Sequence, residues 1–207
     1  MHVSRRHRFV YIGIPRTASK SMFQWLSENF ESENVGGHHD SIVPAEFEDY
    51  FVFTTVRNPY DRAVSGWFFE PVIKSPHDAP KPPSLAASLR NFLAEKRAGT
   101  QKFPGQAGFV QKSGATLALY FERLPECLGE LPFVDKKNIP PFPHNNAGGY
   151  RPPERDFFEL FSSEEEQLVW ELDREDFEMF GYDRFNSGLP EGSNICLHLI
   201  PDRRAAR

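Results

Sequence analysis

Two short apolar runs, each followed at once by a polar segment and a helical pattern, constrain the fold of this chain. Residues 8–14 (RFVYIGI) are nearly all apolar, and apolar residues then recur at three- and four-residue spacing from 22 to 30. A second run, FVFTTV at 51–56, is followed by Pro59, which suits the first turn of a helix. Apolar strands separated by helical sequence predict the α/β class, with a central parallel sheet flanked by helices.

The same patterns predict further elements. Ser163 and Glu166 have the spacing of a capping box, so we expect a helix to start there and run to about Asp176. A third strand is predicted at 116–121, a longer helix at 84–98 and a short helix at 125–129. Prolines and glycines predict loops at 71–83, 99–108 and 138–153, and the first two are candidate lids over an acceptor.

The length of 207 residues suits one compact domain. We expect a single domain over residues 1–185 and assign no element to the tail at 186–207. Cys127 and Cys196 form no disulfide framework or metal-ligand pattern, and we expect reduced thiols. The first residues lack the features of a secretory signal, and no run approaches membrane-spanning length, so we expect a cytoplasmic protein.

Charge is unevenly distributed along the chain. The net charge of −5 argues against a general nucleic-acid or anionic-membrane binder. Residues 1–112 contain 14 Lys and Arg against 11 Asp and Glu, a net of +3, so residues 113–207 carry −8. We expect Arg5, Arg6 and Arg8 to form a solvated terminal run. The positive first half therefore directs the search to a local anion site.

The first candidate anion site is the segment 15–21 (PRTASKS) between the first apolar run and its helix. Backbone N–H groups at a helix N-terminus attract phosphate, and Arg16 and Lys20 add positive charge. The segment differs from a Walker A loop, because Ile14 occupies the place of the first glycine and Ser19 that of the second. A strict P-loop kinase is therefore disfavoured. The alternative interpretation is a polar turn with a Ser or Thr N-cap.

The second candidate site is the segment 56–65 (VRNPYDRAVS). Arg57 follows a buried strand, at the end where α/β folds bind ligands. Ser65 lies about two turns into the next helix, from where it can reach a group held by Arg57. Arg62, between them, is a further candidate cation.

Together these segments resemble sulfotransferases that use 3′-phosphoadenosine 5′-phosphosulfate (PAPS). Residues 15–21 resemble the 5′-phosphosulfate loop of that family, and residues 57–65 its 3′-phosphate motif, Arg-Asn/Asp-Pro-x-x-Arg-x-x-Ser. Segments 120–124, 142–146 and 176–182 are similar to later family signatures and occur in the expected order. The resemblance covers about residues 8–185 and points to the branch that contains bacterial sulfotransferases and carbohydrate 2-O-sulfotransferases.

The resemblance implies a role for each matching residue. Arg16 would stabilise charge on the departing 5′-phosphate, and Arg57 and Ser65 would hold the 3′-phosphate. The residues expected to surround the 5′-phosphate are Thr17, Ala18, Ser19, Lys20 and Ser21. The donor would be PAPS, the product 3′,5′-bisphosphate (PAP), and no metal is implied. Two residues depart from the family pattern: Arg16 stands where lysine is usual, and Lys20 where threonine is common.

A hydroxyl acceptor needs a base near neutral pH, for which histidine is suited. The resemblance places His39 best and His38 second, while two surface histidines in a glycine loop are the structural alternative. Carboxylates at 46, 48 and 49 are other candidate bases. We expect His144 to shape the far wall of the site and His77 to be a loop residue.

The sequence thus predicts sulfuryl transfer from PAPS to a hydroxyl-bearing small molecule or carbohydrate, with no nucleic-acid or membrane partner. The acidic net charge favours a neutral or short acceptor over a heavily sulfated polymer. Two alternatives stay open: an ATP-dependent kinase with Mg²⁺, and a non-catalytic nucleotide-binding protein of the same fold.

Overall fold

The structure is a computed structural model that describes residues 1–74, 85–100, 103–143, 157–185, 189 and 197–199. Its internal contacts divide the chain into two compact units. The first unit comprises residues 1–57, 106–145 and 191–207, and the second comprises 58–105 and 146–190. Each unit is described by itself below.

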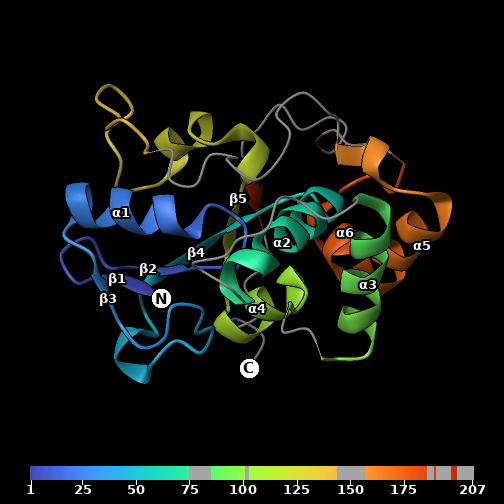
Figure 1. Cartoon of the computed structure of the whole chain (residues 1–207). Coiled ribbons are helices and arrows are strands. Elements are labelled where there is room, and N and C mark those ends of the chain that lie inside the picture. The colour runs from blue at the N-terminus through green and yellow to red at the C-terminus, as the bar shows by residue number, and fades with distance from the viewer. Residues whose placement is uncertain (75–84, 101–102, 144–156, 186–188, 190–196, 200–207) are drawn as a thin grey trace. The chain divides into compact units, whose positions relative to one another are not determined.

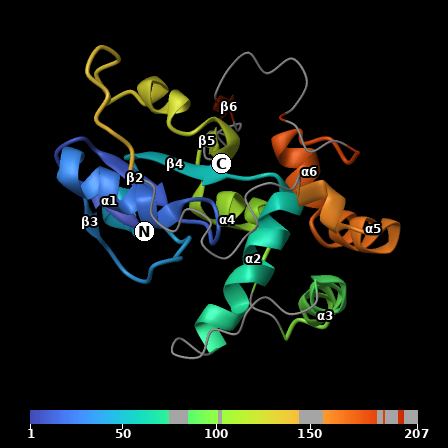
Figure 2. The ribbon, with the colours of Figure 1, turned by 45° about the horizontal axis from the view of Figure 1, so that its top comes forward.

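A six-stranded mixed sheet forms the centre of the first unit (Figure 1). The three inner strands, β2 (Phe9–Ile12), β4 (Phe51–Val56) and β5 (Leu117–Tyr120), are parallel, which confirms the predicted α/β class and its three strands. Antiparallel strands that were not predicted extend both edges: β1 (His2–Ser4) and β3 (Glu33–Asn34) beyond β2, and β6 (Leu197–Leu199) beyond β5. Figure 2 shows β6 beside β5.

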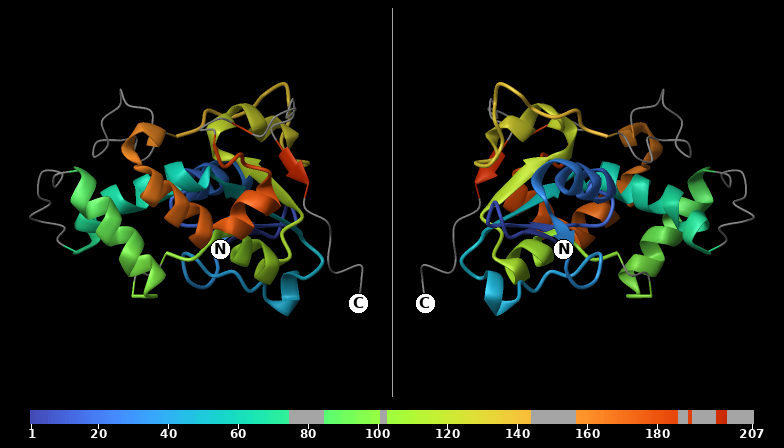
Figure 3. Two further views of the ribbon diagram at one scale, coloured as in Figure 1. Left: turned by 90° about the vertical axis from the view of Figure 1, so that its right-hand side faces the viewer. Right: turned by 90° about the vertical axis from the view of Figure 1, so that its left-hand side faces the viewer.

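Helix α1 (Ser19–Phe30) covers one face of this sheet (Figure 1). Met22, Trp25, Leu26 and Phe30 are buried in the core cluster, which confirms the predicted apolar stripe. The unpredicted helix α4 (Gln106–Ser113) packs against β4 and lies on the opposite face (Figure 3). The short elements of this unit are the 3-10 helices η1 (Ala45–Phe47), η2 (Phe121–Arg123) and η3 (Glu126–Glu130).

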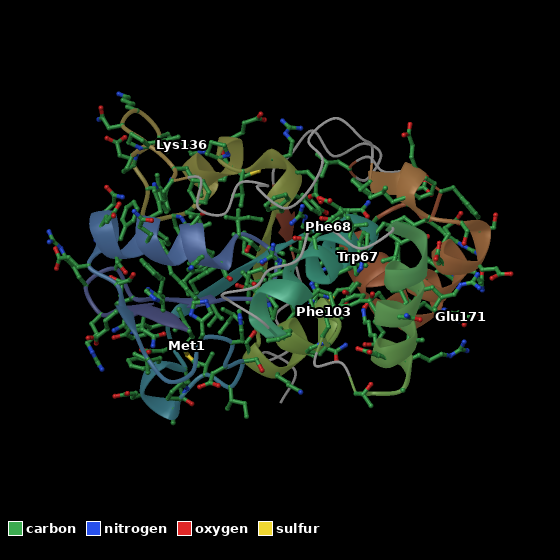
Figure 4. All side chains as sticks on the ribbon, viewed as in Figure 1. Met1, Trp67, Phe68, Phe103, Lys136 and Glu171 are labelled. Atoms are coloured by element: carbon green, nitrogen blue, oxygen red, sulfur yellow. The ribbon has the colours of Figure 1, made fainter. Side chains whose placement is uncertain are left out.

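The second unit is helical in its described part (Figure 2). It contains α2 (Pro59–Lys74), α3 (Leu85–Arg97), η4 (Phe157–Leu160), α5 (Ser163–Leu172) and α6 (Arg174–Phe180). The fully buried Tyr60 packs edge-on against Phe158, Phe161 and Phe177. Trp67, Phe68 and Phe103 mark the apolar interior in Figure 4, and Glu171 points outward from α5.

Some predicted boundaries were wrong. The loop prediction at 71–83 fails at its start, because α2 continues through Lys74, and residues 75–83 lie outside the described residues. The capping box is formed by Ser162 and Glu165 rather than by the predicted pair one residue later. Either register satisfies the Ser-x-x-Glu rule in Ser162-Ser163-Glu164-Glu165-Glu166, so the motif alone leaves the first residue ambiguous. The predicted helix to 176 is interrupted at Asp173, where α5 ends and α6 begins.

Two further findings concern the described residues. Cys127 is buried and is not part of a disulfide, while Cys196 lies outside the described residues. None of the helices described here is both long enough and apolar enough to span a membrane.

Candidate functional site

The segment that joins β2 to α1 has an unusual backbone. Arg16 and Ala18 adopt positive φ values of 68° and 64°, whereas Thr17 between them does not. Each left-handed residue other than glycine costs about 1 kcal/mol, so other contacts must hold this conformation. Backbone N–H groups in a turn of this kind can converge on one concave side, which suits an anion.

Helix α1 starts without a side-chain cap. Its N-cap residue is Ala18, and no N-cap side chain accepts a hydrogen bond from the first turn. This finding contradicts the alternative interpretation of a Ser or Thr N-cap. The helix therefore presents its N-terminal N–H groups and positive dipole end at the segment predicted to bind phosphate.

A buried chain of hydroxyl groups on β2, β4 and the segment 15–21 holds this segment by hydrogen bonds. Thr55 Oγ1 on β4 donates to the carbonyl of Thr17 (2.7 Å), and Thr17 Oγ1 donates to the carbonyl of Ile14 (3.0 Å). Tyr11 Oη lies 2.7 Å from Thr55 Oγ1. Since Thr55 has one hydroxyl proton and gives it to Thr17, Tyr11 must be the donor to Thr55. Burial raises the pKa of the Tyr11 phenol, so this donor keeps its proton.

This network changes the expected role of Thr17. Its side chain is fully buried, with Oγ1 bonded toward Ile14 and 2.9 Å from Thr55 Oγ1. The hydroxyl group thus shapes the segment, and Thr17 as a whole, backbone included, is shielded from solvent. Ser19 and Ser21 are also buried, whereas Lys20 is exposed.

Arg57 lies directly against the same segment. Its Nη1 donates to the carbonyl of Arg16 at 3.1 Å, and its guanidinium lies 3.9 Å from the ring centroid of Phe121. Arg57 is 8% exposed. Burial, and then the charge of Arg57, lower the pKa of Arg16 to about 10, so Arg16 remains cationic at neutral pH. Two neighbouring cations on a helix N-terminus create a field that favours an anion.

The backbone of Arg57 is fixed by a residue that sequence reasoning missed. Gln106, the first residue of α4, accepts a hydrogen bond from the Arg57 N–H at 2.9 Å. The same side chain donates to the Arg57 carbonyl at 2.8 Å. Gln106 is fully buried. A lone glutamine in a segment predicted to be a loop carries no motif, so nothing in the sequence indicated this contact.

The two candidate base histidines occupy different surroundings. His39 Nδ1 lies 2.7 Å from the carbonyl of Gly13, and because a carbonyl only accepts, Nδ1 carries the proton and Nε2 is the acceptor nitrogen of the neutral ring. His38 packs edge-on against Phe23 and His39. Burial, followed by the charges of His39, the amino terminus and Lys20, lowers the pKa of His38. Both histidines are exposed residues.

Gly13 is required where the His39 contact is made. A Cβ atom at this position would lie 2.4 Å from Phe23 Cζ, so a side chain would displace the ring on which His38 packs. Asp40, adjacent to His39 in sequence, accepts a hydrogen bond from the Gly37 N–H instead. The Gly13 carbonyl is a partner that orients the His39 ring.

The other candidate bases belong to a paired, exposed surface. Arg8 forms an ion pair with Asp49, and Arg5 lies 3.8 Å from Glu46. Glu48 is also exposed. Exposed ion pairs of this kind contribute less than about 1 kcal/mol, and they form a charged rim beside η1.

The remainder of the second motif lies in the second unit. Ser65 is a buried residue of α2, and its predicted contact with the phosphate held by Arg57 stays a prediction. Arg62 is 1% exposed, donates to the carbonyl of Pro104 at 2.8 Å and lies 3.9 Å from Asp176, so it serves the interior of that unit. His77 and His144 lie outside the described residues.

Within the described part of the chain, no group of three or more His, Cys, Asp or Glu residues is placed to hold a metal ion. Comparison with family models, curated proteins and solved structures finds no match for this chain. Any function proposed for this chain therefore rests on the residues of the candidate site.

Proposed function

We propose that this protein is a sulfotransferase that transfers the sulfuryl group of PAPS to a hydroxyl acceptor and releases PAP. The observation that carries the proposal is the hydrogen bond from Arg57 to the Arg16 carbonyl, because it joins the two motifs that resemble the family's phosphate motifs. These residues are 41 positions apart in sequence, and the resemblance assigns them to the two ends of one nucleotide.

The residues of the first unit fit such a donor. The 5′-phosphosulfate would meet the P-loop-like segment 15–21, where the uncapped α1 N-terminus and Arg16 favour negative charge. The 3′-phosphate would meet Arg57, whose planar guanidinium is suited to bidentate binding of phosphate oxygens. Exposed Lys20 adds charge at the rim of this site.

The proposed reaction needs a base and a group that stabilises the leaving phosphate. His39 Nε2 takes the proton of the acceptor hydroxyl while the hydroxyl oxygen bonds to sulfur. The bond between sulfur and the bridging oxygen breaks, and its electron pair remains on the 5′-phosphate of PAP. Arg16 stabilises the charge that grows there. The bond from His39 Nδ1 to Gly13 holds the imidazole in the tautomer that accepts at Nε2.

We further propose that the acceptor hydroxyl belongs to a carbohydrate, as in the branch that the sequence resembles. A neutral or short acceptor fits the net charge of −5 better than a polysulfated chain does. A cytoplasmic location also stays a prediction.

Calorimetric titration with PAP and with ATP–Mg²⁺ tests the proposal. We expect PAP to bind at least tenfold more tightly than ATP–Mg²⁺, and Arg57→Ala to weaken PAP binding by about 2 kcal/mol or more. Absence of PAP binding, or a preference for ATP, would overturn the sulfotransferase proposal. PAP binding without transfer from labelled PAPS to any of a panel of mono- and oligosaccharides would favour the non-catalytic alternative.

Replacing His39 tests the base. His39→Asn should lower turnover by about 10²- to 10⁴-fold, the usual contribution of a general base, and leave PAP affinity within twofold. His38→Asn is the matched control and should reduce turnover much less. An equal loss of turnover and PAP affinity in His39→Asn would show that His39 is structural.

A further inference from the structure

Gln106 makes two hydrogen bonds to one residue, and that residue is Arg57. The side-chain oxygen accepts from the Arg57 N–H at 2.9 Å, and the side-chain nitrogen donates to the Arg57 carbonyl at 2.8 Å. The glutamine thereby satisfies both backbone groups of Arg57 just after β4 ends at Val56.

The chemistry of this contact is specific to an amide. A carboxylate at this position could accept from the Arg57 N–H but would face the Arg57 carbonyl with a second acceptor. An aliphatic side chain would leave two backbone groups of Arg57 without this partner in a buried place. The glutamine side chain has both the length to reach Arg57 and the donor and acceptor that match the carbonyl and N–H of Arg57.

Arg57 is consequently fixed at both ends. Gln106 holds its backbone, while the ring of Phe121 and the carbonyl of Arg16 hold its guanidinium. A cation held in this way loses little freedom when it binds an anion, so its binding energy is not spent on ordering the side chain.

We propose that Gln106 is a positioning residue that gives the site its preference for a nucleotide with a 3′-phosphate. This inference rests on the proposed function, in which Arg57 binds the 3′-phosphate. Gln106 does not touch the nucleotide; it acts through the placement of Arg57.

The test compares two nucleotides that differ by the 3′-phosphate, PAP and 5′-AMP. Their dissociation constants are measured calorimetrically for the wild-type protein, Gln106→Leu and Gln106→Met. Both variants remove the two hydrogen bonds at similar volume, and the flexible methionine provides a second variant if leucine impairs folding. Ser113→Ala removes a buried hydroxyl at the other end of α4 and is the matched control.

The wild-type protein should prefer PAP to 5′-AMP, and each Gln106 variant should reduce that preference at least tenfold while 5′-AMP affinity changes less than twofold. Ser113→Ala should keep the preference. An unchanged preference in the variants, or an equal weakening of both nucleotides, would overturn the positioning role. A wild-type protein that does not prefer PAP would instead overturn the proposed function, so the two failures are distinguishable.

A double-mutant cycle adds a readout that a general structural role would not move. In the Arg57→Ala background, Gln106→Leu should cause no further loss of the PAP preference, because the group it positions has been removed. Additive losses in the double variant would show that Gln106 acts independently of Arg57 and would contradict the proposal.

Discussion

Thr55 shows how one buried hydroxyl determines the geometry of the candidate site. It connects Tyr11 on β2 with the carbonyl of Thr17, and Thr17 lies between the two left-handed residues Arg16 and Ala18. Two such residues cost about 2 kcal/mol together, so the loop needs specific contacts to keep this backbone. Thr55 provides one of them from a strand that cannot easily move.

Removing the hydroxyl should therefore affect binding as well as stability. We expect Thr55→Val to lower the free energy of unfolding by about 1–3 kcal/mol and to weaken PAP binding about tenfold, because the loop loses its anchor. Thr55→Ser, which keeps the hydroxyl, should retain most of the affinity. Urea unfolding and calorimetry measure the two effects.

Thr54 is the matched control for this prediction. It is equally buried, and its hydroxyl donates to the carbonyl of Ile12 in the neighbouring strand at 2.7 Å. Thr54→Val should cost similar stability and leave PAP affinity nearly unchanged. Similar affinity losses in both valine variants would mean that Thr55 affects binding through stability alone.

At the scale of elements, α1 begins in a conformation that favours an anion at the expense of stability. Its N-cap, Ala18, has φ 64° and provides no side-chain cap. Glycine adopts this conformation without the steric cost of a Cβ atom, whereas glycine inside a regular helix is unfavourable.

Ala18→Gly should accordingly stabilise the protein by about 0.5–1 kcal/mol in urea unfolding, a direction opposite to the usual effect of glycine. The control is Ala94→Gly at an exposed position within α3, which should destabilise by about 1 kcal/mol. A loss of stability at Ala18 similar to that at Ala94 would contradict the left-handed conformation.

The elements that could be predicted are those whose burial creates a local pattern. β2, β4 and α1 each bury several side chains within one short segment, so periodicity alone located them. β3 has two exposed residues, Glu33 and Asn34, and becomes a strand only through pairing with β1. Such pairing depends on residues far away in sequence, and no local pattern records it.

Some residues of the candidate site could likewise be predicted from a local sequence pattern, and others could not. Arg16 and Arg57 could be predicted because each follows an apolar strand in a charged motif. Gln106, Tyr11 and Thr55 could not, since each looks like an ordinary core or loop residue until the strands are placed side by side. The buried orientation of the Thr17 side chain could not be predicted either, because its partner Thr55 is 38 residues away in sequence.

At the scale of the whole molecule, ion pairs with acidic side chains determine which arginine charges are balanced by a neighbour. Arg5, Arg6 and Arg8 are exposed, as expected of a solvated run, and they pair with Glu33, Glu31 and Asp49. Their charges are thus balanced by acidic neighbours. Within the described part of the first half, Arg16 and Arg57 meet at the N-terminus of α1, where their positive charges lie close together.

The amino-terminal strand should also make the stability of the chain sensitive to acid. His2 is 8% exposed, stacks on Phe23 at 4.1 Å and has Nδ1 3.2 Å from Ser32 Oγ. Burial, and then the charges of the amino terminus and His38, lower the pKa of His2 to about 4. The folded protein therefore resists a proton that the unfolded chain accepts near pH 6.5.

The sign of the effect follows from this difference in proton binding. His2 contributes no pH dependence above about pH 7, and the free energy of unfolding falls as the pH drops from about 6.5 to about 4. We expect a loss of about 2 kcal/mol across this interval, less than the full shift implies because solvent screens the charge. Urea unfolding at pH 7 and pH 4.5 measures it. His2→Phe keeps the stacking on Phe23 but cannot bind a proton, so the loss should be smaller by about that amount; an identical loss in both proteins would show that other groups cause the acid sensitivity.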